Sequence, residues 1–167
     1  MGKTTILTAE NGTLTTAVRN LVHISSAAAG AAAAHLRVKR VEISQNGSTT
    51  LQMIRGAFSL QTAGTTVTAT AVTPVNVSPL GGPASGLTGS TAPAGAAART
   101  GVFATVNTTP TYVDHHTFNF ANLNGYIWKP DPTEELWIPA STIWTARFLA
   151  DPTTMTGWTI SVILDEN

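Results

Sequence analysis

The sequence predicts an all-β protein of one domain, and three observations carry this prediction. Charged residues make up only 11% of the 167 residues while hydrophobic residues reach 43%, so few side chains are available to solvate helix surfaces. Threonine, valine and small neutral residues, which suit a pleated and half-buried surface, take the place of the charges. Short alternating segments separated by turn residues recur along the chain, as expected of a sandwich or jelly roll.

Turn residues divide the chain into segments that predict eight to ten short antiparallel strands. Asn11-Gly12 closes the first segment. Asn46-Gly47 is the strongest short hairpin signal in the chain, and it predicts that the segments on either side of it pair with each other. The expected strand segments are 4–10, 13–24, 35–44, 49–60, 65–72, 101–107, 116–121, 125–128, 135–140, 142–150 and 157–164.

The alternation of side chains indicates which faces of these strands turn to the core. In the last segment one face carries Trp158, Ile160, Val162 and Leu164. In the segment before it, one face carries Trp144, Ala146, Phe148 and Ala150. Trp144 and Trp158 are therefore predicted to be core residues.

The alternation slips inside the third segment, where Leu36 and Val38 face one way and Val41 and Ile43 the other. A matching slip falls at residues 53–54. Each slip predicts a β-bulge, or a strand that bends between two sheets.

Three stretches depart from the strand pattern. Residues 26–34, rich in alanine, predict a short helical turn or a tight small-residue packing contact. Residues 78–101 predict a long Gly/Pro/Ala-rich surface loop, and residues 1–12 are a candidate extended N-terminal arm. Both of these segments are expected to become ordered on a partner.

Composition argues against several classes of partner. The net charge is zero and the nine basic residues are spread along the chain, so no nucleic acid partner is expected. The cluster of Arg37, Lys39 and Arg40 is interpreted as the solvated face of a strand. No run of about eighteen apolar residues predicts a membrane span, and the absence of cysteine excludes disulfides and thiolate metal sites. A neutral, charge-poor surface favours self-association or cover by partners.

Motifs for catalysis or metal binding are weak. The GKTT stretch at residues 2–5 lacks the upstream glycine and strand of a phosphate-binding loop. His115 and His116, after Asp114, are adjacent on a strand and are expected to point to opposite faces, which disfavours joint metal binding. No serine nucleophile motif is present. We therefore expect a protein that is not an enzyme and that holds neither cofactor nor metal.

The stretch WKPDPTEELWIP at residues 128–139 is the best candidate for a functional surface. It predicts a proline-bounded connection between two strands, with its acids either discouraging edge pairing or meeting a basic residue on a neighbouring subunit. Its tryptophans are interpreted as edge-of-core residues, with a sugar-binding surface as the alternative. The candidate interface residues are Asp131, Glu134, Glu135, Trp128 and Arg99.

Four stretches, at residues 43–47, 128–135, 143–149 and 158–166, resemble a family of small phage virion proteins of the capsid decoration (cement) type. The resemblance implies a single-domain jelly-roll β-sandwich and a structural virion protein that binds the outer capsid surface and stabilises the shell. It further implies a homotrimer on the major capsid protein, located in the virion after assembly in the host cytoplasm. The alternatives are a carbohydrate- or receptor-binding jelly-roll module of a phage fibre or tail, and a shell-forming protein.

Overall fold

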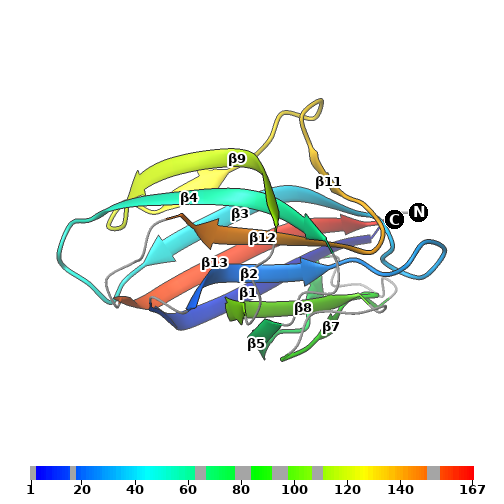
Figure 1. Cartoon of the computed structure of the whole chain (residues 1–167), viewed down its shortest axis with the longest axis horizontal. Helices are drawn as coiled ribbons and strands as arrows, with labels where there is room; N and C mark the ends of the chain where they lie inside the picture. Colours follow the sequence, from blue (N-terminus) through cyan, green and yellow to red (C-terminus); the bar gives the residue numbers. More distant parts are fainter. Residues whose placement is uncertain are drawn as a thin grey trace.

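The computed structural model describes residues 3–15, 18–62, 67–77, 84–91, 98–106, 111–149 and 155–167. Within these residues the chain is all-β, with thirteen strands in two sheets and no helix (Figure 1). Every described strand pairing is antiparallel except that of β7 with β8. The all-β sandwich predicted from the sequence is confirmed. The strands that no expected segment covers, β6 (Val75–Asn76) and β7 (Thr88–Gly89), have only two residues each, which leaves no alternation to detect.

The first sheet is centred on the last strand of the chain. Its order is β10 (Tyr126–Trp128), β3 (Leu36–Gln45), β13 (Met155–Glu166), β1 (Lys3–Leu14) and β6 (Val75–Asn76), and β11 (Leu136–Ile138) also pairs with β3. β13 pairs with β1 from Glu166 to Met155, and with β3 from Glu166 to Trp158. The predicted N-terminal arm is therefore wrong for residues 3–12, because they form a core strand.

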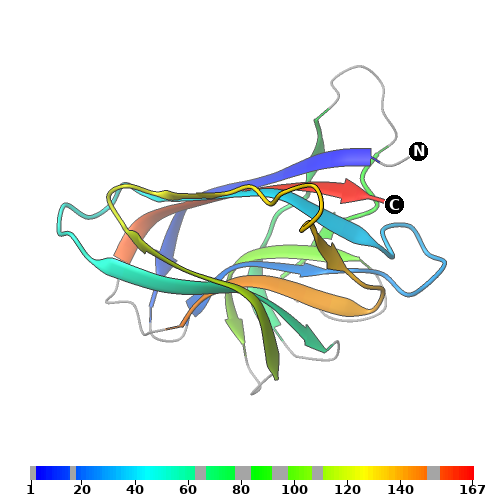
Figure 2. The ribbon, with the colours of Figure 1, turned by 90° about the horizontal axis from the view of Figure 1, so that it is seen from above.

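The second sheet has the order β5 (Val67–Ala71), β8 (Arg99–Val106), β2 (Val18–Ser25), β12 (Thr142–Phe148), β4 (Met53–Thr62) and β9 (Tyr112–Ala121), and β7 (Thr88–Gly89) pairs with β8. Seen from above, β1, β3 and β13 form one layer and β2, β12 and β4 form the other (Figure 2).

The second sheet is not flat. Between β4 and β5 lie three strands, so in a flat sheet their axes would be about 19 Å apart at roughly 4.8 Å per strand. Thr62 and Val67, which end β4 and begin β5, are five residues apart, and five extended residues span only about 17 Å. The sheet bends until these ends can be joined.

The core lies between the two sheets and uses the faces predicted from the alternation. Trp158, Ile160, Val162 and Leu164 of β13 are fully buried, and so are Trp144 and Ala146 of β12, with Phe148 nearly so. Ala150 lies outside the described residues. Phe148 of β12 packs against Trp158 of β13 at a centroid distance of 5.0 Å, and Phe118 of β9 stacks on Tyr126 of β10 at 4.3 Å. The two sheets are therefore joined by an aromatic core.

The bulge predicted in β3 is confirmed. Ile163 of β13 pairs with Arg40, but Leu164 pairs with Val38, so Lys39 is the extra residue. This bulge returns the apolar residues before and after it to the same face, and all four of them are buried. The slip predicted at residues 53–54 is wrong, because Met53 is 71% exposed and Ile54 is buried in regular alternation.

The hairpin predicted at Asn46-Gly47 is also wrong. The strands on either side of it, β3 and β4, lie in different sheets, so this turn crosses the sandwich instead of joining two paired strands. The backbone N–H of Asn46 donates to the carbonyl of Gly157 at 3.0 Å, which holds the crossover against the start of β13. Turn residues predict a change of direction, but they do not identify the strand that follows as the pairing partner.

The described parts of segment 78–101 are not the surface loop that was expected. Residues 88–89 form β7 and residues 99–101 begin β8, while Leu87 is buried in the core at 1% exposure. The carboxylate of Glu166 accepts hydrogen bonds from Gly86 N at 2.7 Å and from Thr5 Oγ1 at 3.1 Å. One buried leucine and one carboxylate thus anchor a stretch whose composition suggested a loop. Residues 78–83 and 92–97 lie outside the described residues.

Residues 26–34 form turns and no helix. Ala27, Ala33 and Ala34 are buried, and Ala27 N donates to the carbonyl of Ala33 at 3.1 Å. Of the two predictions for this stretch, the small-residue packing contact is therefore confirmed.

We expect Leu87→Ala to lower the free energy of unfolding by about 2–5 kcal/mol, because it leaves a cavity in the core. Urea denaturation with the wild type as reference measures this loss. The matched control is Leu51→Ala, which removes the same atoms from a 63% exposed side chain and should stay within about 0.5 kcal/mol. Equal effects of the two substitutions would contradict the anchoring of residues 84–91.

Candidate functional site

The candidate loop links β10 to β11, two short strands that both pair with β3, and it stands out from the sandwich (Figure 1). Trp128, at its start, is half-buried, and its ring centroid lies 5.1 Å from that of Phe58 and 5.7 Å from that of His116. Trp128 is therefore an edge-of-core residue, as interpreted from the sequence. Trp137, at the other end, is 50% exposed, and the guanidinium of Arg37 lies 5.3 Å from its ring centroid.

Asp131 builds the turn at the tip of the loop. Its Oδ1 accepts hydrogen bonds from Thr133 N at 3.0 Å and from Thr133 Oγ1 at 2.7 Å, and its carbonyl accepts one from Glu134 N at 2.8 Å. The hydrogen bond from the Thr133 backbone, followed by that from its side chain, lowers the pKa of Asp131. This carboxylate is occupied in shaping the loop.

Glu135 fastens the loop to the outer face of the first sheet. Its carboxylate pairs with Arg37 at 2.7 Å and with Lys39, and its side chain is only 7% exposed. Asp165 of β13 completes the group, at 2.8 Å from Arg37 and 3.9 Å from Lys39. We call these four residues the ion-pair cluster. The hydrogen bond to Asp165 is the main cause of the raised pKa of Arg37. The prediction of a solvated strand face is therefore wrong for Arg37 and Lys39, on which the loop rests, whereas Arg40 is exposed and pairs with Glu42.

Glu134 has a different environment. It is exposed and lines a hollow of about 270 Å³ together with His115, His116, Trp128, Pro130 and Leu136. The prediction that His115 and His116 point away from each other is wrong, because a register shift makes His115 the extra residue of a bulge opposite β4. Phe58 pairs with His116, whereas Ser59 pairs with Asp114. Both histidines therefore reach one hollow.

Arg99 is not brought to this loop. It begins β8 and pairs with Ser25 of β2 and Thr88 of β7. Strands β2, β12 and β4 separate β8 from β9, which carries the two histidines of the hollow. Of the five candidate residues, four therefore lie in or beside one loop and Arg99 lies on another part of the molecule.

A second polar group lies on the face of the second sheet that turns away from the first sheet, and the sequence did not predict it. We call it the polar face, and its members are Asn20, His23, Ser25, Ser59, Gln61 and Thr145, all at most 3% exposed. They alternate with core residues of β2, β4 and β12. The signal in the sequence was that these positions are polar but uncharged, whereas a solvated strand face usually carries charges.

Hydrogen bonds satisfy only part of the polar face. Thr145 Oγ1 donates to the carbonyl of Val22 at 2.8 Å, and Gln61 Nε2 lies 2.9 Å from His23 Nε2. An amide nitrogen only donates, so His23 carries its proton on Nδ1 in this arrangement. Neither His23 Nδ1 nor Gln61 Oε1 has a partner in the described residues. Burial lowers the pKa of His23 to about 3.

The rim of the polar face is charged and partly exposed. Arg147 pairs with Asp114 at 2.7 Å, and its guanidinium lies 4.0 Å from the ring centroid of Tyr112. Ser59 Oγ donates to Asp114 at 2.6 Å and accepts from Arg147 Nε at 3.0 Å. These hydrogen bonds, together with the charge of Arg147, outweigh burial and lower the pKa of Asp114. The rim therefore holds β4, β9 and β12 together.

The described residues contain no group of three or more histidine, aspartate or glutamate side chains placed to hold an ion. A search for a membrane-spanning helix in the same residues also finds none. No protein-family model matches this chain, and no curated protein or solved structure matches it.

We expect Glu135→Gln to lower the free energy of unfolding by about 1–2 kcal/mol, because Arg37 and Lys39 lose the carboxylate between them. Urea denaturation at low and high salt measures the effect, which should shrink as salt screens the remaining charges. The matched control is Glu134→Gln in the same loop, with an expected change within about 0.5 kcal/mol. Indistinguishable variants would contradict the role of the ion-pair cluster.

We also expect the buried imidazole of His23 to make stability depend on pH. Its folded pKa of about 3 lies below the ordinary value of 6.5, so only the unfolded chain takes up a proton between these limits. The contribution of His23 to the free energy of unfolding is fully present above pH 6.5. It falls by up to about 1.4 kcal/mol per pH unit as the pH drops toward 3. Urea denaturation of wild type and His23→Gln from pH 7.5 to pH 4 should give free energies of unfolding that converge as the pH falls. A constant difference between the two proteins over this range would contradict a buried, neutral His23.

Proposed function

We propose that this chain is a structural virion protein, a capsid decoration (cement) protein that binds the outer surface of a phage shell as a homotrimer. The observation that carries the proposal is the order of the strands. Leaving aside the inserted strands β5 to β8, the first strand pairs with the last, β1 with β13, and the second with the one before it, β2 with β12. Inside these, β3 pairs with β10 and β11, and β4 pairs with β9.

This nested order supports a jelly-roll interpretation of the sandwich. A jelly roll is an eight-stranded double sheet, and viral capsid domains and lectins use it. The insertion between β4 and β9 adds β8 beside β2, β5 beside β8, and β6 beside β1, so it widens both sheets at the same side of the nested core. The fold alone fits several functions, so the choice among them rests on the surface.

The surface supports attachment to partners. The chain carries no net charge, and eight large hydrophobic side chains are exposed in the described residues. They are Leu51, Met53, Val75, Val77, Val113, Leu123, Ile127 and Trp137. A neutral surface with exposed apolar side chains favours association over solubility as a monomer. The resemblance to decoration proteins implies the major capsid protein as the partner and the capsid surface as the location.

The use of the acids in the loop supports a structural and non-enzymatic role. Asp131 is held by Thr133 in a turn, and Glu135 is held by Arg37 and Lys39. Paired carboxylates that act as acid and base need room for a substrate between them, whereas these two serve to shape and fasten one loop. Bound copies would stabilise the shell by mass action, since they bind only the assembled state.

We expect the purified protein to bind undecorated phage heads in a fixed number of copies and to raise their thermal stability. Sedimentation of heads with labelled protein measures the copy number, and scanning calorimetry measures the stability. Light scattering on the free protein should give the mass of a trimer. A monomer that binds no such shell, tested on heads stripped of their decoration protein, would overturn the proposal.

The exposed tryptophan favours one alternative, a carbohydrate- or receptor-binding module of a phage fibre or tail. Trp137 is half exposed above Arg37, the arrangement of an aromatic surface on which a sugar ring stacks. Glycan-array binding that disappears in Trp137→Ala and persists in Trp128→Phe would favour this function. Trp137 is the residue to test, because Trp128 packs against the core.

A further inference from the structure

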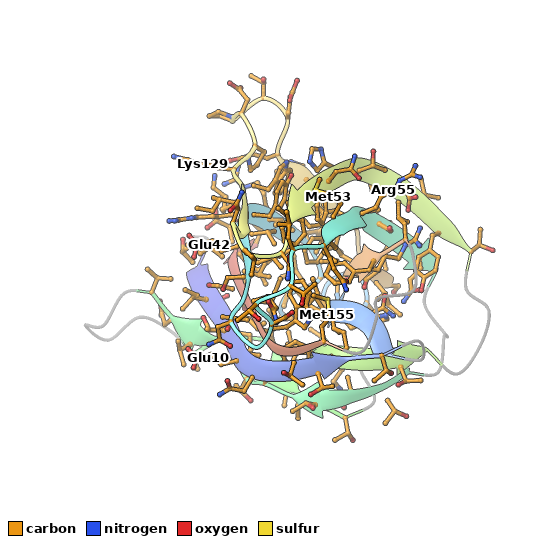
Figure 3. All side chains as sticks on the ribbon, turned by 90° about the vertical axis from the view of Figure 1, so that its left-hand side faces the viewer. Glu10, Glu42, Met53, Arg55, Lys129 and Met155 are labelled. Carbon is orange, nitrogen blue, oxygen red and sulfur yellow. The ribbon has the colours of Figure 1, made fainter. Side chains whose placement is uncertain are left out.

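The hollow beside the loop combines one carboxylate with aromatic walls. Strand β9 contributes His115 and His116 to its lining, and the end of β10 contributes Trp128. The loop contributes Pro130 and Glu134, and the start of β11 contributes Leu136. In the end-on view, Lys129 lies beside the protruding loop, and Glu10 lies on β1, away from that loop (Figure 3). No lysine or arginine of the described residues lines the hollow.

Among the acids of the loop, Glu134 alone is left without a partner. Asp131 accepts hydrogen bonds from Thr133, and Glu135 is paired with Arg37 and Lys39. The side chain of Glu134 makes no hydrogen bond or ion pair within the described part of the chain, and it is exposed at the mouth of the hollow. Asp131 and Glu135 thus fix the loop, while the carboxylate of Glu134 is left exposed at the hollow.

The aromatic groups of the hollow favour a cation. Tryptophan is the best side chain for a cation–π contact, and Trp128 is held in place by Phe58 and His116. The Nε2 atom of His116 lies 2.8 Å from Tyr126 Oη. Burial lowers the pKa of His116, so this side chain adds no opposing charge near neutral pH. Glu134 supplies the negative charge, and a guanidinium or ammonium group can contact both the ring and the carboxylate.

We propose that this hollow receives a basic side chain, arginine or lysine, of a partner protein. Its volume of about 270 Å³ is below the roughly 300–1,000 Å³ of pockets for whole drug-sized ligands, so it suits a single side chain. The fixed loop means that the site is formed before the partner arrives, which lowers the entropic cost of binding. The site goes beyond the proposed function, because its chemistry does not depend on the partner being a capsid protein.

A small probe tests the site directly. In ¹⁵N-labelled protein, titration with Nα-acetyl-arginine methylamide should shift the assigned indole N–H resonance of Trp128 in a saturable way, and added salt should weaken the binding. The neutral isostere Nα-acetyl-citrulline methylamide is the control. Equal shifts with both probes, or shifts from galactose and none from the arginine probe, would overturn the proposal.

Variants locate the charge that matters. Glu134→Gln should weaken binding of the arginine probe roughly threefold to tenfold, as expected for the loss of one half-exposed charge in contact with the ligand. Glu10→Gln is the matched control, since it removes the same charge from β1, which β3 and β13 separate from β10, and it should leave the affinity unchanged. Equal weakening in both variants would indicate a general charge effect and overturn the assignment.

The probe experiment and the phage-head experiment fail separately. Binding of the arginine probe without binding to heads supports the hollow as a site and counts against capsid attachment. Binding to heads that Glu134→Gln weakens, while Glu10→Gln does not, supports both. Binding to heads by a protein that shows no arginine-dependent shift leaves the proposed function standing and overturns this inference.

Discussion

The pairing of β13 with both β1 and β3 is the constraint on which the rest of the structure depends. This strand places four buried apolar side chains at the centre of the first sheet, and the bulge at Lys39 lets β3 match it along its whole length. Its last residues also fix two other parts of the molecule. Asp165 joins the ion-pair cluster beneath the loop, and Glu166 holds residues 84–91 through Gly86. One strand therefore connects the core, the loop and the insertion.

The loop shows how three neighbouring carboxylates can have three unrelated roles. In the sequence, Asp131, Glu134 and Glu135 form a single acidic group, and such a group invites a catalytic interpretation. In space, one shapes a turn, one is paired with two cations, and one is presented beside an aromatic hollow. The sequence could predict that the loop was proline-bounded and exposed. It could not predict these roles, because Arg37 and Lys39 come from a strand remote in the chain and the placement of His116 depends on a bulge opposite β4.

Alternation along the chain predicted most strands and their buried faces, because the period of two is a local property of the backbone. It could not predict pairing partners, and so the Asn46-Gly47 turn was mistaken for a hairpin although it crosses between sheets. The bulge at His115 was missed for a related reason, since its position depends on the facing strand β4. Leu87 was overlooked because composition averages over a segment and hides one buried side chain.

The nested order of strands has a consequence for how the protein is made. Thr4 donates a hydrogen bond to Asp165 across 161 positions of sequence, and contacts of such separation form only after a large entropic cost. While the chain lengthens on the ribosome, β1 and β3 keep the open edges that β13 later covers. Open edges attract other unfinished chains. The interval before the final strand pairs is therefore the period in which these edges are open to aggregation.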